Sequence, residues 1–262
     1  MDYTLLTGAS SGIGFELAYE FAMNKHPLIL VARSTDKLTE LKTQLEDKFK
    51  IKVEVISLDL SRPDSADQLY KTVKEKNLKV DILVNNAGFG DHGLFADTEL
   101  SRNEDMIVLN ILTLTKLTHL FLPDMLKSGR GRILNVASTA AFQPGPLMSV
   151  YYATKAYVLS FSEGLYQELQ GTGVTVTALC PGPTTSGFQA AANIQDIKLL
   201  KVLHIPTSKQ VAQYGYKTLM SGKAVAVHGL MNYILTVCNG FMPRAIVRNA
   251  VMRLQQKRLP HS

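Results

Sequence analysis

The chain has 262 residues, of which 46% are apolar and 19% are charged, so it holds enough apolar material for a sizeable core and is not a disordered chain. Its two cysteines, Cys180 and Cys238, lie far apart and form no CxxC pair or Cys/His ligand set, which excludes a zinc ribbon and a disulfide scaffold and predicts no metal site. Reduced cysteines and an N-terminus without the basic and apolar segments of a signal peptide predict a cytoplasmic location.

The net charge of +6 is unevenly distributed. Residues 189–262 carry ten Lys or Arg and one acid, Asp196, whereas residues 1–188 carry more acids than bases. No nucleic-acid-binding motif accompanies the basic quarter, so it suits an anionic surface or substrate and we expect no nucleic-acid partner. The weakly charged run 224–242 is interrupted by polar residues and glycines, which argues against a membrane span.

Short apolar runs alternate with longer amphipathic stretches along the chain. The predicted strands are 3–7, 28–32, 52–58, 80–85, 132–137, 174–179 and 224–227. The predicted helices are 13–24, 36–49, 65–77, 104–126, 151–170 and 208–220. Strands that are apolar throughout are buried on both faces, so the pattern predicts a doubly wound α/β fold: one domain with a seven-stranded parallel sheet covered by helices on both faces.

A glycine-rich turn joins the first predicted strand to the first helix. Gly8, Ser10, Gly12, Ile13 and Gly14 belong to the segment TGASSGIG. Glycines let the backbone approach a pyrophosphate, and the N-terminus of the helix offers unpaired N–H groups to it. The turn therefore predicts a dinucleotide site.

The residue after the second strand indicates which dinucleotide binds. Arg33 stands there, and no acid follows before Asp36. A guanidinium binds the additional phosphate of NADP that a carboxylate would repel, so we predict NADP(H); the alternative is a solvated surface arginine. Asp59 after the third strand either accepts a bond from the adenine amino group or caps the next turn.

Tyr151 and Lys155 are four residues apart in a predicted helix and share one face. A nearby ammonium favours the phenolate and lowers the tyrosine pKa, which predicts a proton donor and acceptor for a carbonyl or alcohol oxygen. Ser138, at the end of the fifth strand, is predicted to bind that oxygen, and Asn110, in mid-helix, to hold a water. Tyr152 is a competing phenol, and each residue alone also has a purely structural explanation.

Several motifs and residues occur together in this chain: TGASSGIG, the NNAG run ending in Asn86, Ala87 and Gly88, Asn110, Ser138, the Tyr151–Lys155 pair and Pro181-Gly182. With this combination the chain resembles the short-chain dehydrogenase/reductase family, in its compact single-domain branch. The resemblance implies an Asn-Ser-Tyr-Lys tetrad, with Tyr151 as general acid/base, Lys155 holding the ribose, and a homodimer or homotetramer. It also implies further cofactor contacts from Leu60, Asp59 and Thr184. In overall character the chain is similar to bacterial members that act on acyl or steroid-like carbonyls.

Two segments near the C-terminus bear on the substrate. The apolar-rich stretch 183–206 predicts a substrate lid, the alternative being an ordinary surface excursion. Residues 243–262 predict a basic C-terminal helix, which we expect to dock on the protein rather than on a membrane. The sequence thus predicts an NADP(H)-dependent oxidoreductase that interconverts a ketone or aldehyde with an alcohol, on a lipophilic small molecule. The alternatives are a non-catalytic NADP(H)-sensing protein and a lipid carbonyl reductase at a membrane surface.

Overall fold

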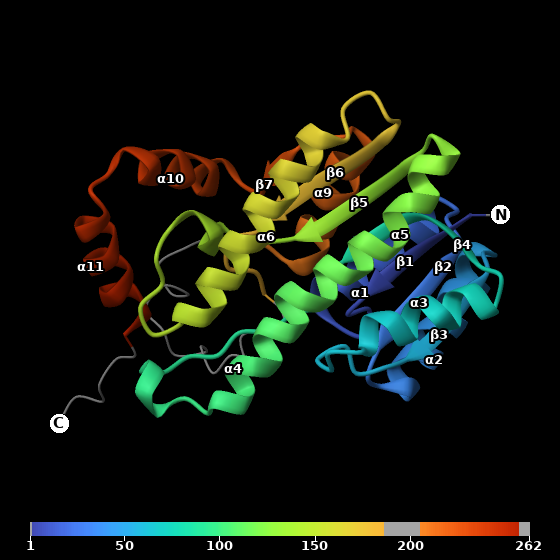
Figure 1. The fold of residues 1–262 in the computed structure, drawn as a ribbon, viewed down its shortest axis with the longest axis horizontal. Coiled ribbons are helices and arrows are strands. Elements are labelled where there is room, and N and C mark those ends of the chain that lie inside the picture. Colours follow the sequence, from blue (N-terminus) through green and yellow to red (C-terminus); the bar gives the residue numbers. More distant parts are fainter. Residues whose placement is uncertain (1, 186–204, 257–262) are drawn as a thin grey trace.

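A computed structural model describes residues 2–185 and 205–256 of the chain. Its centre is a parallel sheet of seven strands in the order β3-β2-β1-β4-β5-β6-β7 (Figure 1). The strands are β1 (Asp2–Thr7), β2 (Leu28–Ala32), β3 (Val53–Ser57), β4 (Lys79–Asn85), β5 (Gly131–Val136), β6 (Val174–Cys180) and β7 (Val225–Val227). The order reverses direction between β1 and β4, which is where sheets of this kind bind ligands.

Helices connect the strands and cover both faces of the sheet. They are α1 (Gly12–Met23), α2 (Thr35–Phe49), α3 (Ser65–Glu75), α4 (Leu100–Ile107), α5 (Leu114–Ser128), α6 (Ser149–Glu168), α9 (Ser208–Met220), α10 (Leu230–Phe241) and α11 (Arg244–Gln255). Two 3-10 turns, η1 (Phe95–Asp97) and η3 (Thr139–Phe142), and a π-helical turn, η2 (Val108–Thr113), complete the described elements. The predicted doubly wound α/β fold is confirmed.

Alternate residues of each strand enter different cores. In β1, Leu6 packs with α1, α2 and α9, whereas Leu5 packs with α3, α5 and α6. In β2, Leu30 belongs to the first core and Ile29 to the second. Because strand side chains alternate between faces, a strand covered on both sides is mostly apolar, as β2 is at all its positions.

The predicted strands agree with the structure to within one residue at nearly every end, and the predicted helix 208–220 coincides with α9. The predicted helix 104–126 is part of a longer helical stretch, Leu100–Ser128, which is long and apolar enough to cross a membrane. Leu117, Phe121 and Met125 of this stretch are instead buried in the second core, so it is a core helix. The run 224–242 divides into β7 and α10, and α10 was not predicted.

Candidate active site

The glycine-rich turn has the geometry of a phosphate cradle. Gly8 and Gly12 have φ angles of +69° and +58°, in the left-handed region that favours glycine. A Cβ on Gly14 would lie 2.2 Å from the carbonyl oxygen of Gly8, so helix and turn fit together only with glycine there. The side chain of Ser11, the N-cap of α1, makes no capping hydrogen bond within the described residues. The first-turn N–H groups of α1 therefore suit an anion, as a dinucleotide pyrophosphate requires.

Two side chains from neighbouring strands hold this turn in place. The Asn86 amide nitrogen Nδ2 donates to the carbonyl oxygens of Thr7 and Gly8, at 3.0 and 3.1 Å. The Thr7 hydroxyl donates to the Val84 carbonyl and accepts from the N–H groups of Asn86 and Ala87. Sequence analysis did not identify Thr7 for this role, because only the β1–β4 pairing brings it opposite the NNAG segment.

The remaining predicted cofactor residues lie along the same edge of the sheet. Ser10 and Ile13 are half-buried on the turn and on α1, and Ile13 packs against the first core. The carbonyl oxygen of Leu60 accepts a hydrogen bond from the Thr113 hydroxyl at 2.9 Å. A Cβ on Gly88 would lie 2.9 Å from Asn110 Oδ1, which leaves room for glycine alone.

Arg33 is exposed directly after β2, with its side chain available to a phosphate at the predicted position. Asp59 Oδ1 accepts from the amide and the hydroxyl of Ser61, at 3.0 and 2.8 Å, so the capping alternative describes this oxygen. Burial favours a higher pKa for Asp59, but the Ser61 hydrogen bonds and the nearby guanidinium of Arg33 hold that pKa below its usual value. The adenine contact of Asp59 stays a prediction.

Ser138, Tyr151 and Lys155 meet at the carboxyl end of β5. The Tyr151 side chain is hydrogen-bonded to that of Ser138. Lys155 Nζ lies 5.8 Å from the centre of the Tyr151 ring and donates to the Val136 carbonyl at 2.8 Å. The predicted serine, tyrosine and lysine are thus brought together at the strand ends, on the same edge as the glycine turn.

The electrostatics of this group differ from the sequence-based expectation. Burial raises the pKa of the Tyr151 phenol, the hydrogen bond with Ser138 acts in the opposite direction, and Tyr152 raises the pKa further. Burial also lowers the pKa of Lys155 to about 8. The ammonium is itself disfavoured by desolvation and is tied to the Val136 carbonyl, so the expected lowering of the tyrosine pKa by Lys155 is not observed. At neutral pH the Tyr151 phenol is protonated, ready to donate.

Tyr152, the competing phenol, serves a different purpose. Its hydroxyl accepts a hydrogen bond from Gln255 Nε2 at 2.7 Å, and its ring packs against Gly145, where a Cβ would meet it at 2.0 Å. Tyr152 therefore contacts both α11 and the segment before α6 and helps to hold them together. These contacts favour Tyr151 over Tyr152 as the proton donor, and that role stays a prediction.

Asn110 is buried, with 1% of its surface exposed, and lies within the π-helical turn η2. Its Nδ2 donates to the Phe89 carbonyl and to the Thr154 hydroxyl, both at 3.0 Å, and its Oδ1 accepts from the Phe89 N–H at 3.2 Å. Asn110 thus tethers the segment after Gly88 to α6, through a threonine that sequence analysis did not identify. One acceptor position of Oδ1 remains, so the water-holding role stays a prediction.

The segment after β6 contacts α10. Ser138 donates to the Pro181 carbonyl at 3.4 Å, and Thr184 donates to the Gly182 carbonyl at 2.9 Å. A Cβ on Gly182 would lie 2.5 Å from the side chain of Asn232 on α10. Of the predicted lid 183–206, residues 186–204 lie outside the described part of the chain.

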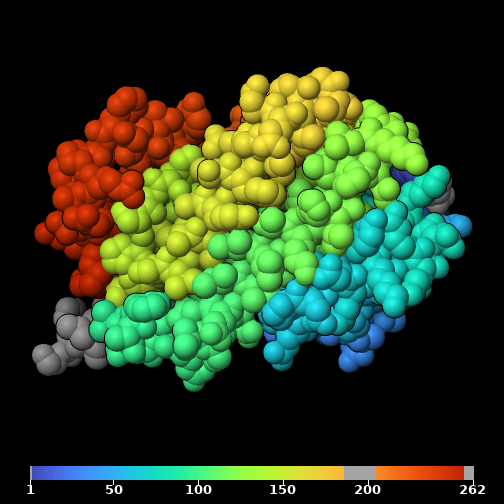
Figure 2. All heavy atoms as spheres, in the orientation of Figure 1, coloured from blue at the N-terminus to red at the C-terminus, as the bar shows by residue number. Residues whose placement is uncertain are grey.

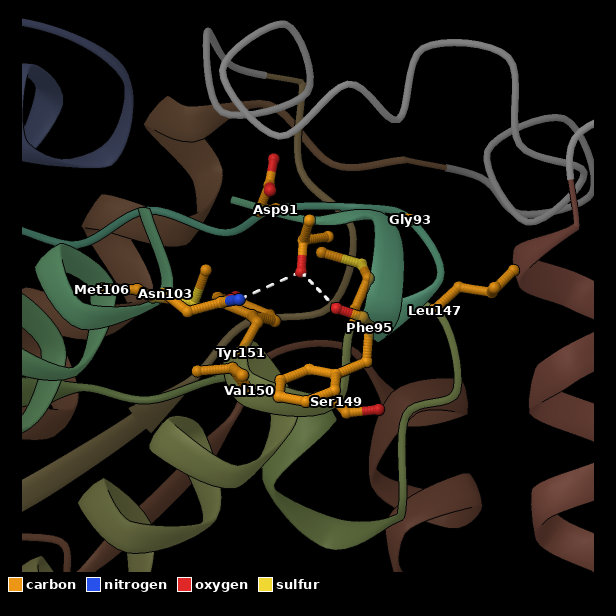
Figure 3. Close-up of a pocket in the computed structure, with 11 residues that line it drawn as sticks. Asp91, Gly93, Phe95, Asn103, Met106, Leu147, Ser149, Val150 and Tyr151 are labelled. Carbon is orange, nitrogen blue, oxygen red and sulfur yellow. Dashed lines mark hydrogen bonds between the residues drawn. The ribbon is translucent and has the colours of Figure 1, made fainter. Parts of the chain in front are cut away.

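A small pocket reaches Tyr151 from the side of α4 (Figure 3). Its lining combines apolar side chains (Phe95, Met106, Leu147, Met148 and Val150) with polar ones (Asp91, Thr98, Asn103 and Ser149). Ser138 and Lys155 are not among its lining residues, so the pocket extends beside the reacting hydroxyl rather than around it. Leu147 and Met148 line this pocket, whereas Phe142 packs against another core cluster, under α6.

Comparison with known proteins agrees with this geometry. Residues 2–196 match the family model for short chain dehydrogenases. The chain belongs to the short-chain dehydrogenase family of oxidoreductases. It is 30% identical over 255 residues to the human very-long-chain 3-oxoacyl-CoA reductase, covering 95% of this chain and 79% of that protein.

Two solved short-chain dehydrogenase structures share the fold over most of their length. One, from Sphingobium yanoikuyae, is in complex with NADPH; it has a TM-score of 0.82 at 32% identity and covers 92% of this chain and 95% of that one. The other is a bulky-bulky ketone specific alcohol dehydrogenase from Comamonas testosteroni, with a TM-score of 0.78 at 28% identity, covering 92% and 94%.

Proposed function

We propose that this short-chain dehydrogenase is an NADP(H)-dependent reductase of lipophilic ketones, with the carbonyl of an acyl chain as the leading substrate class. The observation that carries the proposal is the buried Tyr151 phenol, hydrogen-bonded to Ser138 beside Lys155. A protonated phenol held next to a second hydroxyl can bind a carbonyl oxygen and deliver a proton to it.

The cofactor assignment rests on residues of this chain and on its relatives. The uncapped N-terminus of α1 and the glycine-only contact between Gly14 and Gly8 fit a pyrophosphate, and the exposed Arg33 fits the additional phosphate of NADP(H). The Sphingobium relative in complex with NADPH supports the same choice. When bound, the nicotinamide supplies the hydride that reduces the carbonyl carbon.

The residues of the chain then perform the remaining chemistry. Ser138 and Tyr151 hold the carbonyl oxygen, Tyr151 donates its proton as negative charge develops there, and the Ser138 hydroxyl, whose hydrogen bond favours a lower Tyr151 pKa, stabilises the phenolate left behind. The Lys155 ammonium, beside the Tyr151 ring, holds the ribose of the cofactor. Asn110 keeps α6 in register with the segment after Gly88, so the lysine and tyrosine stay aimed at the same point. Low exposure of this group keeps water away from it.

The apolar side chains that line part of the pocket beside Tyr151, among them Phe95, Met106 and Met148, support a lipophilic substrate. The names of two relatives, a very-long-chain 3-oxoacyl-CoA reductase and a bulky-bulky ketone specific alcohol dehydrogenase, point to large carbonyl compounds. A cytoplasmic location and a homo-oligomeric state stay predictions.

The test is NADPH oxidation against a series of ketones and 3-oxoacyl thioesters of graded chain length. We expect kcat/KM to rise with chain length, and Tyr151→Phe to lower kcat by about 10²–10⁴-fold while NADPH binding is kept. Unchanged turnover in Tyr151→Phe would refute the mechanism. NADPH binding without turnover of any carbonyl in the series would favour the sensing protein instead.

A further inference from the structure

Helix α10 turns polar side chains toward the protein and apolar side chains toward the outside, the reverse of an ordinary surface helix. The residues that face the protein are polar: Thr236 is buried, and Asn239 Nδ2 donates to Gln143 Oε1 at 2.6 Å. Large apolar side chains face outward, and Leu230 and Phe241 have 76% and 86% of their surface exposed. The other exposed apolar residues of this segment are Met231, Tyr233, Ile234, Leu235, Val237 and Met242.

The other helices of the sheet layers behave in the ordinary way. Helix α9, for example, buries Val211 and Leu219 and exposes its lysines. Scattered apolar residues occur on any protein surface, but eight exposed apolar residues within the short segment 230–242 mark a surface that contacts another apolar phase.

Helix α11 extends this surface and adds positive charge. Val247, Val251 and Gln255 are buried against the body of the protein, whereas Ile246 and Leu254 are exposed. Arg244, Arg248 and Arg253 are exposed on the same helix. The last acidic residue of the sequence is Asp196, so no carboxylate accompanies these arginines on either helix. Figures 1 and 2 show α10 and α11 together at one end of the molecule, far from the N-terminus.

From these features we infer that α10 and the outer side of α11 form a docking face for an anionic lipid bilayer surface. Exposed apolar side chains enter the boundary between headgroups and acyl chains, and nearby arginines pair with the anionic headgroups. Helix α10 has 12 residues, which at 1.5 Å per residue is about 18 Å, shorter than the roughly 30 Å apolar core of a bilayer. It lies along the surface and does not cross the membrane.

A second copy of the chain fits this face less well. A two-fold symmetric interface places the same patch of both copies together, so any partner of an arginine across it comes from this same face. No acidic residue on α10 or α11 is present to pair with them. The anionic headgroups of a lipid bilayer supply the negative charge that these arginines lack on α10 and α11.

The docking face also borders the catalytic group. Helix α10 contacts the strand-end segments through the Asn239–Gln143 bond and the approach of Asn232 to Gly182. Helix α11 places Val247 and Val251 in the same apolar cluster as Tyr151. A bilayer at this face would therefore lie close to the catalytic group, which suits a lipophilic carbonyl that arrives from the lipid phase. This last point rests on the proposed function, whereas the docking itself does not.

The test is co-sedimentation of the full chain with vesicles, which needs no knowledge of the activity. One set of vesicles is phosphatidylcholine alone and the other also contains phosphatidylglycerol. The apolar variant is Ile234→Ser with Phe241→Ser, and its control is Met23→Ser, an apolar residue of α1 that is 52% exposed. The charge variant replaces Arg244, Arg248 and Arg253 by Gln, and its control replaces the exposed Lys37, Lys71 and Lys76 by Gln.

We expect the wild-type chain to bind the anionic vesicles and to be released by high salt, with little binding to phosphatidylcholine. The apolar variant and the charge variant should each lose binding by about tenfold or more, and both controls should stay within about twofold of wild type. Thermal melting of every variant verifies that the fold is intact. Absence of binding to anionic vesicles, or equal binding by the apolar variant, would overturn the inference. So would a wild-type dimer that ignores vesicles and becomes a monomer in the apolar variant, because a second copy then occupies the face.

Discussion

Gln255, at the end of α11, donates its side-chain N–H to the hydroxyl of Tyr152, the residue next to Tyr151, at 2.7 Å. The backbone carbonyl of Gln255 also lies 2.9 Å from His92 Nε2, and the side chain has 2% of its surface exposed. Helix α11 is thereby fastened to both sides of the pocket that reaches Tyr151. The expectation of a C-terminal helix docked on its own domain agrees with these contacts, although its outer side remains exposed.

This contact predicts that Gln255 positions the wall of the substrate pocket. Gln255→Ala should lower the free energy of unfolding by about 1–3 kcal/mol, since a buried hydrogen bond and its packing are lost. It should also raise KM for long ketones more than it lowers kcat, because Ser138, Tyr151 and Lys155 are untouched. Thermal melting and kinetics over the chain-length series measure both effects.

The matched control is the neighbouring Gln256→Ala, since Gln256 is exposed. A double-mutant cycle of Gln255→Ala with Tyr152→Phe should give a coupling of about 1 kcal/mol, which isolates the pair itself. Additive effects in the cycle, or a Gln255→Ala protein that melts and binds like wild type, would rule out the positioning role.

The second prediction concerns Arg33 and the preference for NADPH over NADH. Arg33→Ala should weaken NADPH binding by about 10–100-fold, the value of a charge-assisted bond to phosphate, and change NADH binding by less than about threefold. Titration of each dinucleotide by intrinsic or nicotinamide fluorescence measures the two affinities. The control is Arg62→Ala, because Arg62 is also exposed and also acts on the Asp59 carboxyl. Equal losses for NADPH and NADH would contradict a phosphate-binding role for Arg33.

The pKa directions predict how carbonyl reduction depends on pH. Burial raises the pKa of Tyr151, so this phenol keeps its proton at neutral and mildly alkaline pH. Burial lowers the pKa of Lys155 to about 8, so the ammonium becomes neutral as the pH rises through that value. Because the proposed mechanism needs both protons in place, kcat/KM for reduction should be level below about pH 7 and decline above about pH 8.

The measurement is a pH profile of ketone reduction at saturating NADPH, with dinucleotide affinity determined separately at each pH. A profile that stays level to about pH 10 would show that Lys155 titrates at its ordinary value in the working enzyme. The Lys37→Gln variant, altered at a distant exposed lysine, should keep the wild-type profile.

Much of the fold was determined by the sequence alone, for a local reason. Strands buried on both faces are mostly apolar and are followed by glycines or polar residues, so their ranges can be predicted without tertiary information. The same holds for the glycine turn and for the Tyr151–Lys155 spacing, because helix periodicity places both side chains on one face.

Tertiary structure decided what depends on partners distant in the chain. Tyr151 and Tyr152 look alike in sequence, and only the contact with Ser138 and the bond from Gln255 separate their roles. The direction of the Tyr151 pKa follows from burial, which no spacing encodes. Helix α10 was not predicted because the run 224–242 was considered only as an apolar stretch with polar interruptions. The outward direction of its apolar side chains is a tertiary feature, since the helical period is the same whichever face is buried. Which face meets the protein is set by Gln143 and Gly182, far away in sequence, and that is why the structure was needed to find it.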